Sequence, residues 1–237
     1  GLGFLYSSKR MLVRMSLPVF NFIIKRVIKD DLTDVVVQNQ DNMLFFRQRI
    51  GIKINRLHLI RGSGVALRDL DECVMPKGEV IVTLAGRMLW STGVSQFVDA
   101  ARILRAQGVQ VRMVLVGVPD AANPDYVPSE LLVEWAEEEI IEWWGFCDDM
   151  NSIWKATSIA VFPTWYGEGI PKALLEAASF ARPVIATDVP GCRDVIEQDV
   201  NGLLIKPRSA KALAAAIVKY IEDPLLVDRT RLSLHKS

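Results

Sequence analysis

The chain has few of the residues that build metal centres and disulfide frameworks. Its 237 residues include 2 His and 3 Cys, and the cysteines (Cys73, Cys147 and Cys192) are far apart and odd in number. Two histidines cannot form a multi-histidine metal site. Three distant cysteines match neither the spacing of zinc ligands nor a paired disulfide framework. We therefore expect no metal, and free thiols in a reducing, cytoplasmic setting.

The chain also lacks an excess of one charge sign and a long apolar run. It contains 28 basic and 28 acidic residues, for a formal net charge of +0. This balance gives no general attraction to nucleic acid, so we expect no nucleic-acid partner. Lys or Arg interrupts the longest apolar stretches before the roughly 18 residues that a membrane span needs. No signal-peptide pattern follows residue 1.

One segment, residues 9–29, combines basic and apolar side chains and contains no acid. Its basic residues are Lys9, Arg10, Arg14, Lys25, Arg26 and Lys29. Such a helix can lie on an anionic membrane surface, which would place the protein at the inner face of the membrane. It can equally be a domain helix whose apolar face packs inward. The sequence leaves both interpretations open.

Short apolar runs rich in Val and Ile alternate with helical patterns from residue 79 onward. The runs span residues 80–85, 111–117, 139–144, 158–162, 183–187 and 202–205. Most lack strict polar alternation, which is typical of strands buried on both faces of a parallel sheet. Helical patterns include 171–180, opened by Pro171, and a helix from Ser209 to about Glu222. The order predicts an α/β fold, a Rossmann-like doubly wound parallel sheet.

The first 61 residues follow a different pattern. After the basic helix come a strand at 35–38, a helix at 42–50 and a short strand at 57–60, and the first 40 residues show no self-sufficient core. These elements look like the end of another domain. Gly and Ser at 62–64 favour a hinge. We therefore divide the chain into residues 1–61, an incomplete domain end with its hinge, and residues 62–237, the Rossmann-like domain.

The sharpest motif is the stretch 166–176, which links a buried strand to a helix. Gly167 and Gly169 allow a ligand to approach the backbone. The free N–H groups that open the helix can bind a phosphate, which the helix dipole also favours. Glu168 precedes the helix and Glu176 lies in its second turn, so a diphosphate at the helix start would have a carboxylate on each side. Hydroxyl pairs of a sugar and of a ribose suit such carboxylates.

With this motif, the chain resembles the family 4 retaining glycosyltransferases of GT-B fold. The matching segments are 62–65, 86–87, 162–164, 168–176, 181–191 and 201–204, and the resemblance spans most of residues 35–223. It implies transfer of a sugar from a nucleoside diphosphate to an acceptor hydroxyl with retention, without cofactor or metal. Residues 62–237 would then be the donor-binding domain, and residues 1–61 the end of the acceptor-binding domain. A surface polysaccharide or lipopolysaccharide pathway, with a lipid-linked or saccharide acceptor, fits this reading.

The resemblance also implies roles for single residues. Glu168 would contact sugar hydroxyls and Arg87 would neutralise the diphosphate leaving group, as the two catalytic residues. Glu176 would bind the ribose. The remaining implied binding residues are Gly64, Thr92, Trp144, Phe146, Gly167, Gly169, Ile170, Pro171 and Lys172. Among these, backbone N–H groups around Gly169 and Ile170 would hold the distal phosphate, and the turn with Trp144 and Phe146 would lie beside the base.

The chain departs from the family pattern at several points. Thr92 stands where the family has a lysine that joins the arginine on the diphosphate, Ala66 replaces a common Asp, and Arg61 replaces a common Pro. Much of the acceptor-binding domain is missing, and we expect the chain to stop after Pro224, before a helix that crosses back. We therefore predict that this chain alone transfers no sugar. Two alternatives stay open: a non-catalytic nucleotide-sugar-binding remnant and a nucleotide-sugar epimerase.

Overall fold

The computed structural model describes residues 11–28, 33–62, 64–166 and 169–236. Its main feature is a six-stranded sheet in the order β5-β4-β3-β6-β7-β8, in which all neighbouring strands are parallel. The strands are β3 (Ile81–Ala85), β4 (Arg112–Val116), β5 (Glu142–Trp143), β6 (Ile159–Phe162), β7 (Val184–Thr187) and β8 (Leu203–Ile205). This confirms the predicted α/β fold with a parallel sheet.

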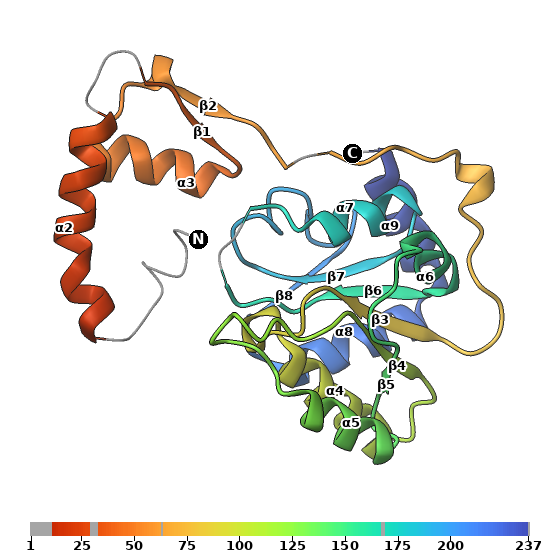
Figure 1. Cartoon of the computed structure of the whole chain (residues 1–237). Coiled ribbons are helices and arrows are strands. Elements are labelled where there is room, and N and C mark those ends of the chain that lie inside the picture. The colour runs from red at the N-terminus through yellow and green to blue at the C-terminus, as the bar shows by residue number, and fades with distance from the viewer. Residues whose placement is uncertain (1–10, 29–32, 63, 167–168, 237) are drawn as a thin grey trace.

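Helices cover both faces of this sheet (Figure 1). One face carries α4 (Val94–Ala106), α5 (Ser129–Glu137) and α8 (Ala210–Glu222). The other carries α6 (Met150–Ala156), α7 (Lys172–Ser179) and α9 (Pro224–Lys236). The layers explain the sequence pattern of the strands. In β6, Ile159 and Val161 join the core on the α4 side, while Ala160 and Phe162 join the core on the α7 side.

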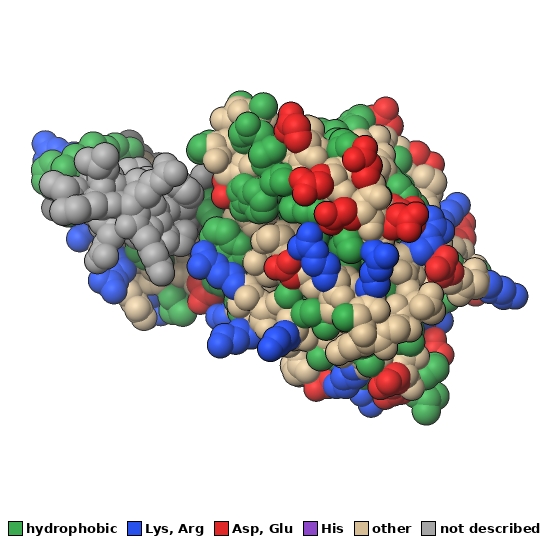
Figure 2. Space-filling view, turned by 90° about the horizontal axis from the view of Figure 1, so that it is seen from below, with side chains coloured by type: hydrophobic (Ala, Val, Ile, Leu, Met, Phe, Trp, Pro, Cys, Tyr) green, Lys and Arg blue, Asp and Glu red, His purple; other side chains and the backbone are tan. Residues whose placement is uncertain are grey.

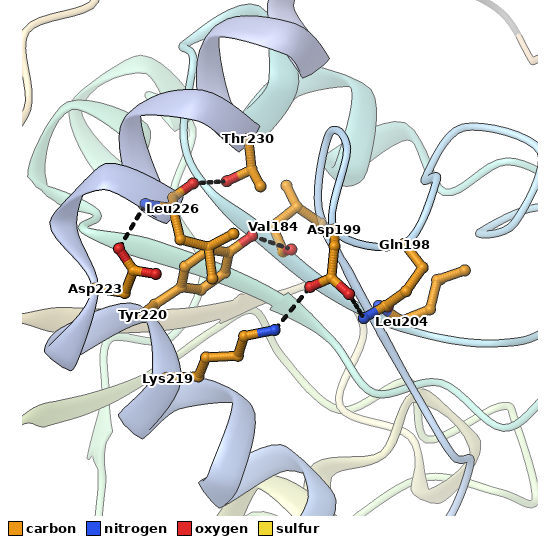
Figure 3. A network of polar contacts seen from close by, with 9 residues as sticks. All are labelled: Val184, Gln198, Asp199, Leu204, Lys219, Tyr220, Asp223, Leu226 and Thr230. Carbon is orange, nitrogen blue, oxygen red and sulfur yellow. Dashed lines mark hydrogen bonds and ion pairs between the residues drawn. The ribbon is translucent and has the colours of Figure 1, made fainter.

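The expectation that the chain stops before a helix that crosses back is wrong, because α9 is such a helix. Pro224 does end α8, but it also occupies the first turn of α9, a position that suits a residue without a backbone N–H. The Asp223 carboxylate accepts a hydrogen bond from the Leu226 N–H at 2.9 Å and so caps this helix (Figure 3). Leu226 packs in the core under α8 and Leu234 in the core under α7, so α9 crosses from one face to the other.

The end of α8 is fastened to the neighbouring strands by polar contacts (Figure 3). The Tyr220 hydroxyl donates to the Val184 carbonyl of β7 at 3.2 Å, and burial raises the pKa of this phenol. The Lys219 ammonium lies 2.7 Å from the Asp199 carboxylate in the loop before β8. This hydrogen bond lowers the pKa of Asp199. These contacts fix the end of α8 beside β7 and the loop that precedes β8.

A smaller N-terminal unit precedes the large one (Figure 1). It contains α2 (Met11–Ile28), β1 (Val35–Val37), α3 (Gln40–Phe45), a π-helical turn (Phe46–Ile50) and β2 (Leu57–Leu59). The strands β1 and β2 pair in parallel, and Val37, Phe46, Ile50, Ile52 and Leu57 form its own small core. The predicted helix at 42–50 is therefore present as two segments, which Gly51 ends in a left-handed conformation.

The helix α2 packs only part of its apolar surface inward. Ile24 and Ile28 contact the small core. Four other apolar side chains on the described part of this helix are more than half exposed, namely Val19, Phe22, Ile23 and Val27. Among the described residues, no helix is long and apolar enough to cross a membrane.

Charged side chains of both signs are interspersed on the face shown in Figure 2. Oppositely charged pairs also lie at short distances in the structure, such as Arg102 with Asp99 at 3.1 Å and Arg112 with Glu142 at 2.7 Å. This is the distribution expected from the balanced composition.

Candidate functional site

A cleft of about 1430 Å³ opens where β3 and β6 end. The chain builds β3, β4 and β5 outward in one direction and then returns to place β6 on the other side of β3. The loops after β3 and β6 therefore diverge, and such a switch point is where open α/β sheets bind ligands. Both loops line the cleft, as do residues from the loops after β4 and β8 and the start of α7.

The structure brings most of the predicted residues to this cleft. Those in its lining are Arg87, Thr92, Gly169, Ile170, Pro171, Lys172 and Glu176. Gly64 lines a smaller cleft of about 220 Å³, which shares Lys172 and Glu176 with the large one. Gly167 and Glu168 lie outside the described residues.

Trp144 and Phe146 lie outside the described lining of both clefts. The Trp144 indole is half-buried and donates a hydrogen bond of 2.9 Å to the Glu142 carboxylate. The Phe146 side chain is 70% exposed. The predicted contact of this turn with a nucleotide base stays a prediction.

The helix α7 presents its N-terminus to the cleft. The first intrahelical bonds run from Leu174 and Leu175 to the Pro171 carbonyl, so the N–H groups of Lys172 and Ala173 precede the hydrogen-bonded turns. Pro171 is the cap residue and makes no side-chain cap hydrogen bond. These N–H groups, together with the helix dipole, form an arrangement suited to a phosphate.

The N-terminal unit approaches Gly169 closely. A Cβ atom at Gly169 would meet the end of the Gln38 side chain, which also lines the cleft and would have to move. Two further contacts connect the units nearby, from Gln40 N–H to Asp194 at 3.3 Å and from Arg193 to Asp41 at 3.7 Å. The two units thus contact each other beside the cleft.

The Glu176 carboxylate faces the cleft from the second turn of α7. Its side chain is 22% exposed and lies 3.1 Å from the Lys172 ammonium. The indole N–H of the fully buried Trp154 lies 3.4 Å from its second oxygen. Because these donors fix the carboxylate at the cleft wall, Glu176 is positioned to accept hydrogen bonds from a ligand hydroxyl pair.

Arg87 enters the cleft from the loop after β3. Its guanidinium lies 3.2 Å from the Asp120 carboxylate in the loop after β4 and is 63% exposed. Thr92 stabilises the turn that follows Arg87. Its hydroxyl donates a hydrogen bond to the Leu89 carbonyl at 2.8 Å and lies 3.2 Å from the Arg87 carbonyl. The cation expected beside Arg87 in the family is thus replaced by a hydroxyl that is already used within the loop.

Contacts between backbone and side chains fasten the loop after β3 to the loop after β6. The Trp165 N–H and the Thr164 hydroxyl both donate to the Ser91 carbonyl, at 3.1 and 3.0 Å. The Trp165 indole donates to the Trp90 carbonyl at 3.0 Å. A side chain at Gly93 would collide with the backbone of Pro163, so the loops pack directly on each other.

Sequence reasoning missed several residues in the lining, including Gln38, Asp120, Asp125, Trp165 and Arg208. They come from four different loops, Asp120 and Asp125 from the same one, and carry no motif of their own. Asp120, Trp165 and Arg208 do share one signal, because each lies a few residues after a strand of the parallel sheet. Since the carboxyl ends of parallel strands meet at one edge, this position alone marks them as candidates.

Comparison with known proteins addresses the family of the chain. Residues 79–223 match the family described as glycosyl transferases group 1. The N,N'-diacetylbacillosaminyl-diphospho-undecaprenol alpha-1,3-N-acetylgalactosaminyltransferase of Campylobacter jejuni is 27% identical over 250 residues, which cover 100% of this chain and 62% of that protein. The UDP-Gal:alpha-D-GlcNAc-diphosphoundecaprenol alpha-1,3-galactosyltransferase of Escherichia coli is 24% identical over 160 residues, 67% of this chain and 41% of that protein.

Solved structures show the same fold. Sucrose-phosphate synthase from Thermosynechococcus elongatus superposes with a TM-score of 0.78 at 22% identity, over 100% of this chain and 60% of that one. HepE of Anabaena in complex with UDP gives a TM-score of 0.76 at 20% identity, over 91% and 61%. The chain thus spans less than two thirds of each of these proteins. Because the matched segment 79–223 makes up more than half of the chain and holds most of the cleft, the chain belongs to the group 1 glycosyltransferases, of the family 4 type with GT-B fold.

Proposed function

We propose that the cleft binds a nucleoside-diphosphate sugar and that the protein transfers this sugar to an acceptor hydroxyl with retention of configuration. The observation that carries the proposal is the meeting of Arg87, the α7 N-terminus and Glu176 at one cleft. Arg87 comes from the loop after β3, and the other two groups come from α7. Together they match the charges of a nucleoside diphosphate, with cationic and N–H groups for the phosphates and a carboxylate for the ribose hydroxyls.

Each group has a distinct task in this proposal. The diphosphate would lie on the N–H groups at the start of α7, near the backbone of Gly169 and Ile170. Arg87 would stabilise the negative charge that develops as the diphosphate leaves, which is the electrostatic demand of this reaction. Glu176 would bind the ribose, and Glu168 is proposed to contact the sugar hydroxyls. No metal or other cofactor takes part in this scheme.

The chain would be the donor-binding part of its enzyme, with residues 1–61 as the end of the acceptor-binding domain. Two relatives carry names in which the acceptor sugar is attached to diphospho-undecaprenol. These names support a lipid-linked acceptor in polysaccharide synthesis at the cytoplasmic side of a membrane. The exposed apolar side chains of α2, together with exposed Lys25 and Arg26, support a peripheral contact of this helix with an anionic membrane.

Calorimetric titration with UDP, GDP and ADP and their common sugar conjugates tests donor binding. We expect one nucleotide series to bind, and R87A and E176Q each to weaken it about tenfold or more, since each removes a charge-assisted contact. The matched control E134Q changes an exposed glutamate of α5, outside the cleft lining. Absence of nucleotide binding, or an equal loss in E134Q, would contradict the proposal.

A second candidate function is that of a binding protein without transferase activity. It is favoured by Thr92, which stands in place of the cation expected beside Arg87. A site with one cation less on the leaving diphosphate can bind a donor and still fail to cleave it. Joining the chain to a complete acceptor-binding domain of a relative and supplying the donor with a saccharide acceptor separates the two functions. Transfer identifies an enzyme, and tight binding without transfer identifies the remnant. Conversion of the free nucleotide sugar without acceptor would instead identify the epimerase alternative.

A further inference from the structure

Arg208 lies in the cleft although the predicted site did not include it. It follows β8 and directly precedes Ser209, the cap residue of α8. Its guanidinium carbon lies 3.9 Å from the centre of the Trp165 ring, which also lines the cleft. The loop after β8 and the loop after β6 thus meet through a cation stacked on an aromatic ring.

Arg208 differs from the other cations of the cleft in its partners. Arg87 is paired with Asp120 at 3.2 Å, and Lys172 is paired with Glu176 at 3.1 Å. Among the described residues, no acidic side chain lies within ion-pair distance of the Arg208 guanidinium. Stacking occupies a face of the guanidinium but not its in-plane N–H donors, and these can bind an anion in bidentate geometry.

The backbone at Arg208 is held in an unfavourable conformation. Its φ is 60°, in the left-handed region where a Cβ atom crowds the following carbonyl and glycine is the favoured residue. The side chain is exposed and contributes nothing to the apolar cores. Of the four described non-glycine residues with such a φ, Arg208 is the one in the lining of the cleft, where its guanidinium pairs with no described acid.

We propose that Arg208 is an anion-binding residue that contacts a phosphate or diphosphate group of a substrate in the cleft, with the Trp165 ring orienting its guanidinium. The inference rests on the proposed function, because it assumes that phosphorylated substrates occupy this cleft. Arg208 would provide the second cation that Thr92 does not provide beside Arg87. The phosphate could belong to the nucleotide donor or to a diphosphate-linked lipid acceptor.

The test compares R208G and R208K with the unaltered 237-residue chain. Glycine removes the guanidinium and also relieves the left-handed backbone, so R208G should melt at the same temperature as the unaltered chain or higher. The matched control is E139G, because Glu139 has a φ of 55° and lies outside the cleft lining. Titrations use the nucleoside diphosphate that binds best among UDP, GDP and ADP, and separately farnesyl diphosphate with farnesol as its uncharged counterpart.

We expect R208G to lose at least tenfold in affinity for one of the two diphosphates, and E139G to lose none. R208K should lie between, because an ammonium keeps the charge but cannot bind bidentately. Loss for the nucleotide assigns Arg208 to the donor, and loss for farnesyl diphosphate but not farnesol assigns it to the acceptor. Unchanged affinities in R208G overturn this inference and leave the proposed function intact. If the unaltered chain binds neither diphosphate, both fail.

Discussion

The guanidinium of Arg182 donates a hydrogen bond of 2.8 Å to the backbone carbonyl of Val74, 108 positions earlier in the chain. Arg182 is completely buried, and it also donates to the carbonyls of Phe180 at 2.8 Å and Thr157 at 3.3 Å. Burial lowers the pKa of Arg182 to about 10, which leaves the group charged at neutral pH. The arginine thus fastens the segment between the two units to the large one.

Replacing this arginine by methionine, R182M, should destabilise the protein. Each buried carbonyl left without a donor costs about 1–3 kcal/mol, and the relief from burying a charge offsets part of this sum. We expect a net loss of about 2 kcal/mol in the free energy of unfolding, measured by urea denaturation. The control R105M alters an exposed arginine of α4 and should change stability by less than about 0.5 kcal/mol. Equal stability of R182M and R105M would show that the buried contacts contribute nothing.

The ion pair between Arg112 and Glu142 makes the stability of the folded protein depend on pH. Two hydrogen bonds from Arg112, at 2.7 and 2.9 Å, and one from the Trp144 indole lower the pKa of Glu142. A depressed carboxylate pKa stabilises the folded state above the unfolded pKa, near 4.5, and this contribution is lost as pH falls through the folded value.

Thermal unfolding of the unaltered chain and E142Q between pH 7 and pH 3 measures this contribution. We expect the melting temperatures to differ at pH 7 and to converge as the pH falls below about 4.5, because the glutamine cannot gain a proton. A difference that stays constant over the whole range would mean that ionisation of Glu142 does not stabilise the fold.

The loop after β3 offers a test by gain of function. In T92K, the lysine would place an ammonium beside Arg87 at the cleft, at the cost of the hydroxyl contact with the Leu89 carbonyl. We expect the affinity for a nucleoside diphosphate to rise about tenfold, the scale of one charge-assisted contact. Calorimetric titration checks this, with Q107K as a control that adds the same charge at the exposed end of α4. A similar gain in Q107K would point to net charge rather than to the site.

The central strands could be predicted because they are buried on both faces and therefore mostly apolar, as in β6 and β7. The least accurate prediction was β5, expected at 139–144 and present only at Glu142–Trp143. Glu139 is left-handed, and the Ile140 N–H bonds back to the Trp135 carbonyl, so these residues complete the end of α5. That choice depends on how the helix end packs, which the local pattern does not specify.

The residues of the candidate site also include some that the sequence could predict and some that it could not. The α7 residues were predictable because a glycine-rich loop and a helix start are contiguous in the sequence, and their geometry follows from local chemistry. Arg208 and Trp165 meet across two loops, from residues 43 positions apart, and no local pattern marks that contact. The hydroxyl contact of Thr92 with the Leu89 carbonyl was likewise hidden, because it depends on the path of the turn and belongs to no motif.

The last prediction concerns activity of the chain by itself. Of the residues that the structure describes in the cleft lining, Gln38 alone comes from the N-terminal unit, and all others belong to the large unit. A transferase of this architecture needs an acceptor hydroxyl held close to the sugar in the correct orientation, and one side chain cannot provide that. We therefore expect the 237-residue chain to bind its donor and to transfer no sugar to a lipid-linked or saccharide acceptor. The measurement is transfer of a radiolabelled sugar, with the chain joined to a relative's acceptor-binding domain as the positive control. Transfer by the chain alone would mean that the donor-binding unit also positions the acceptor.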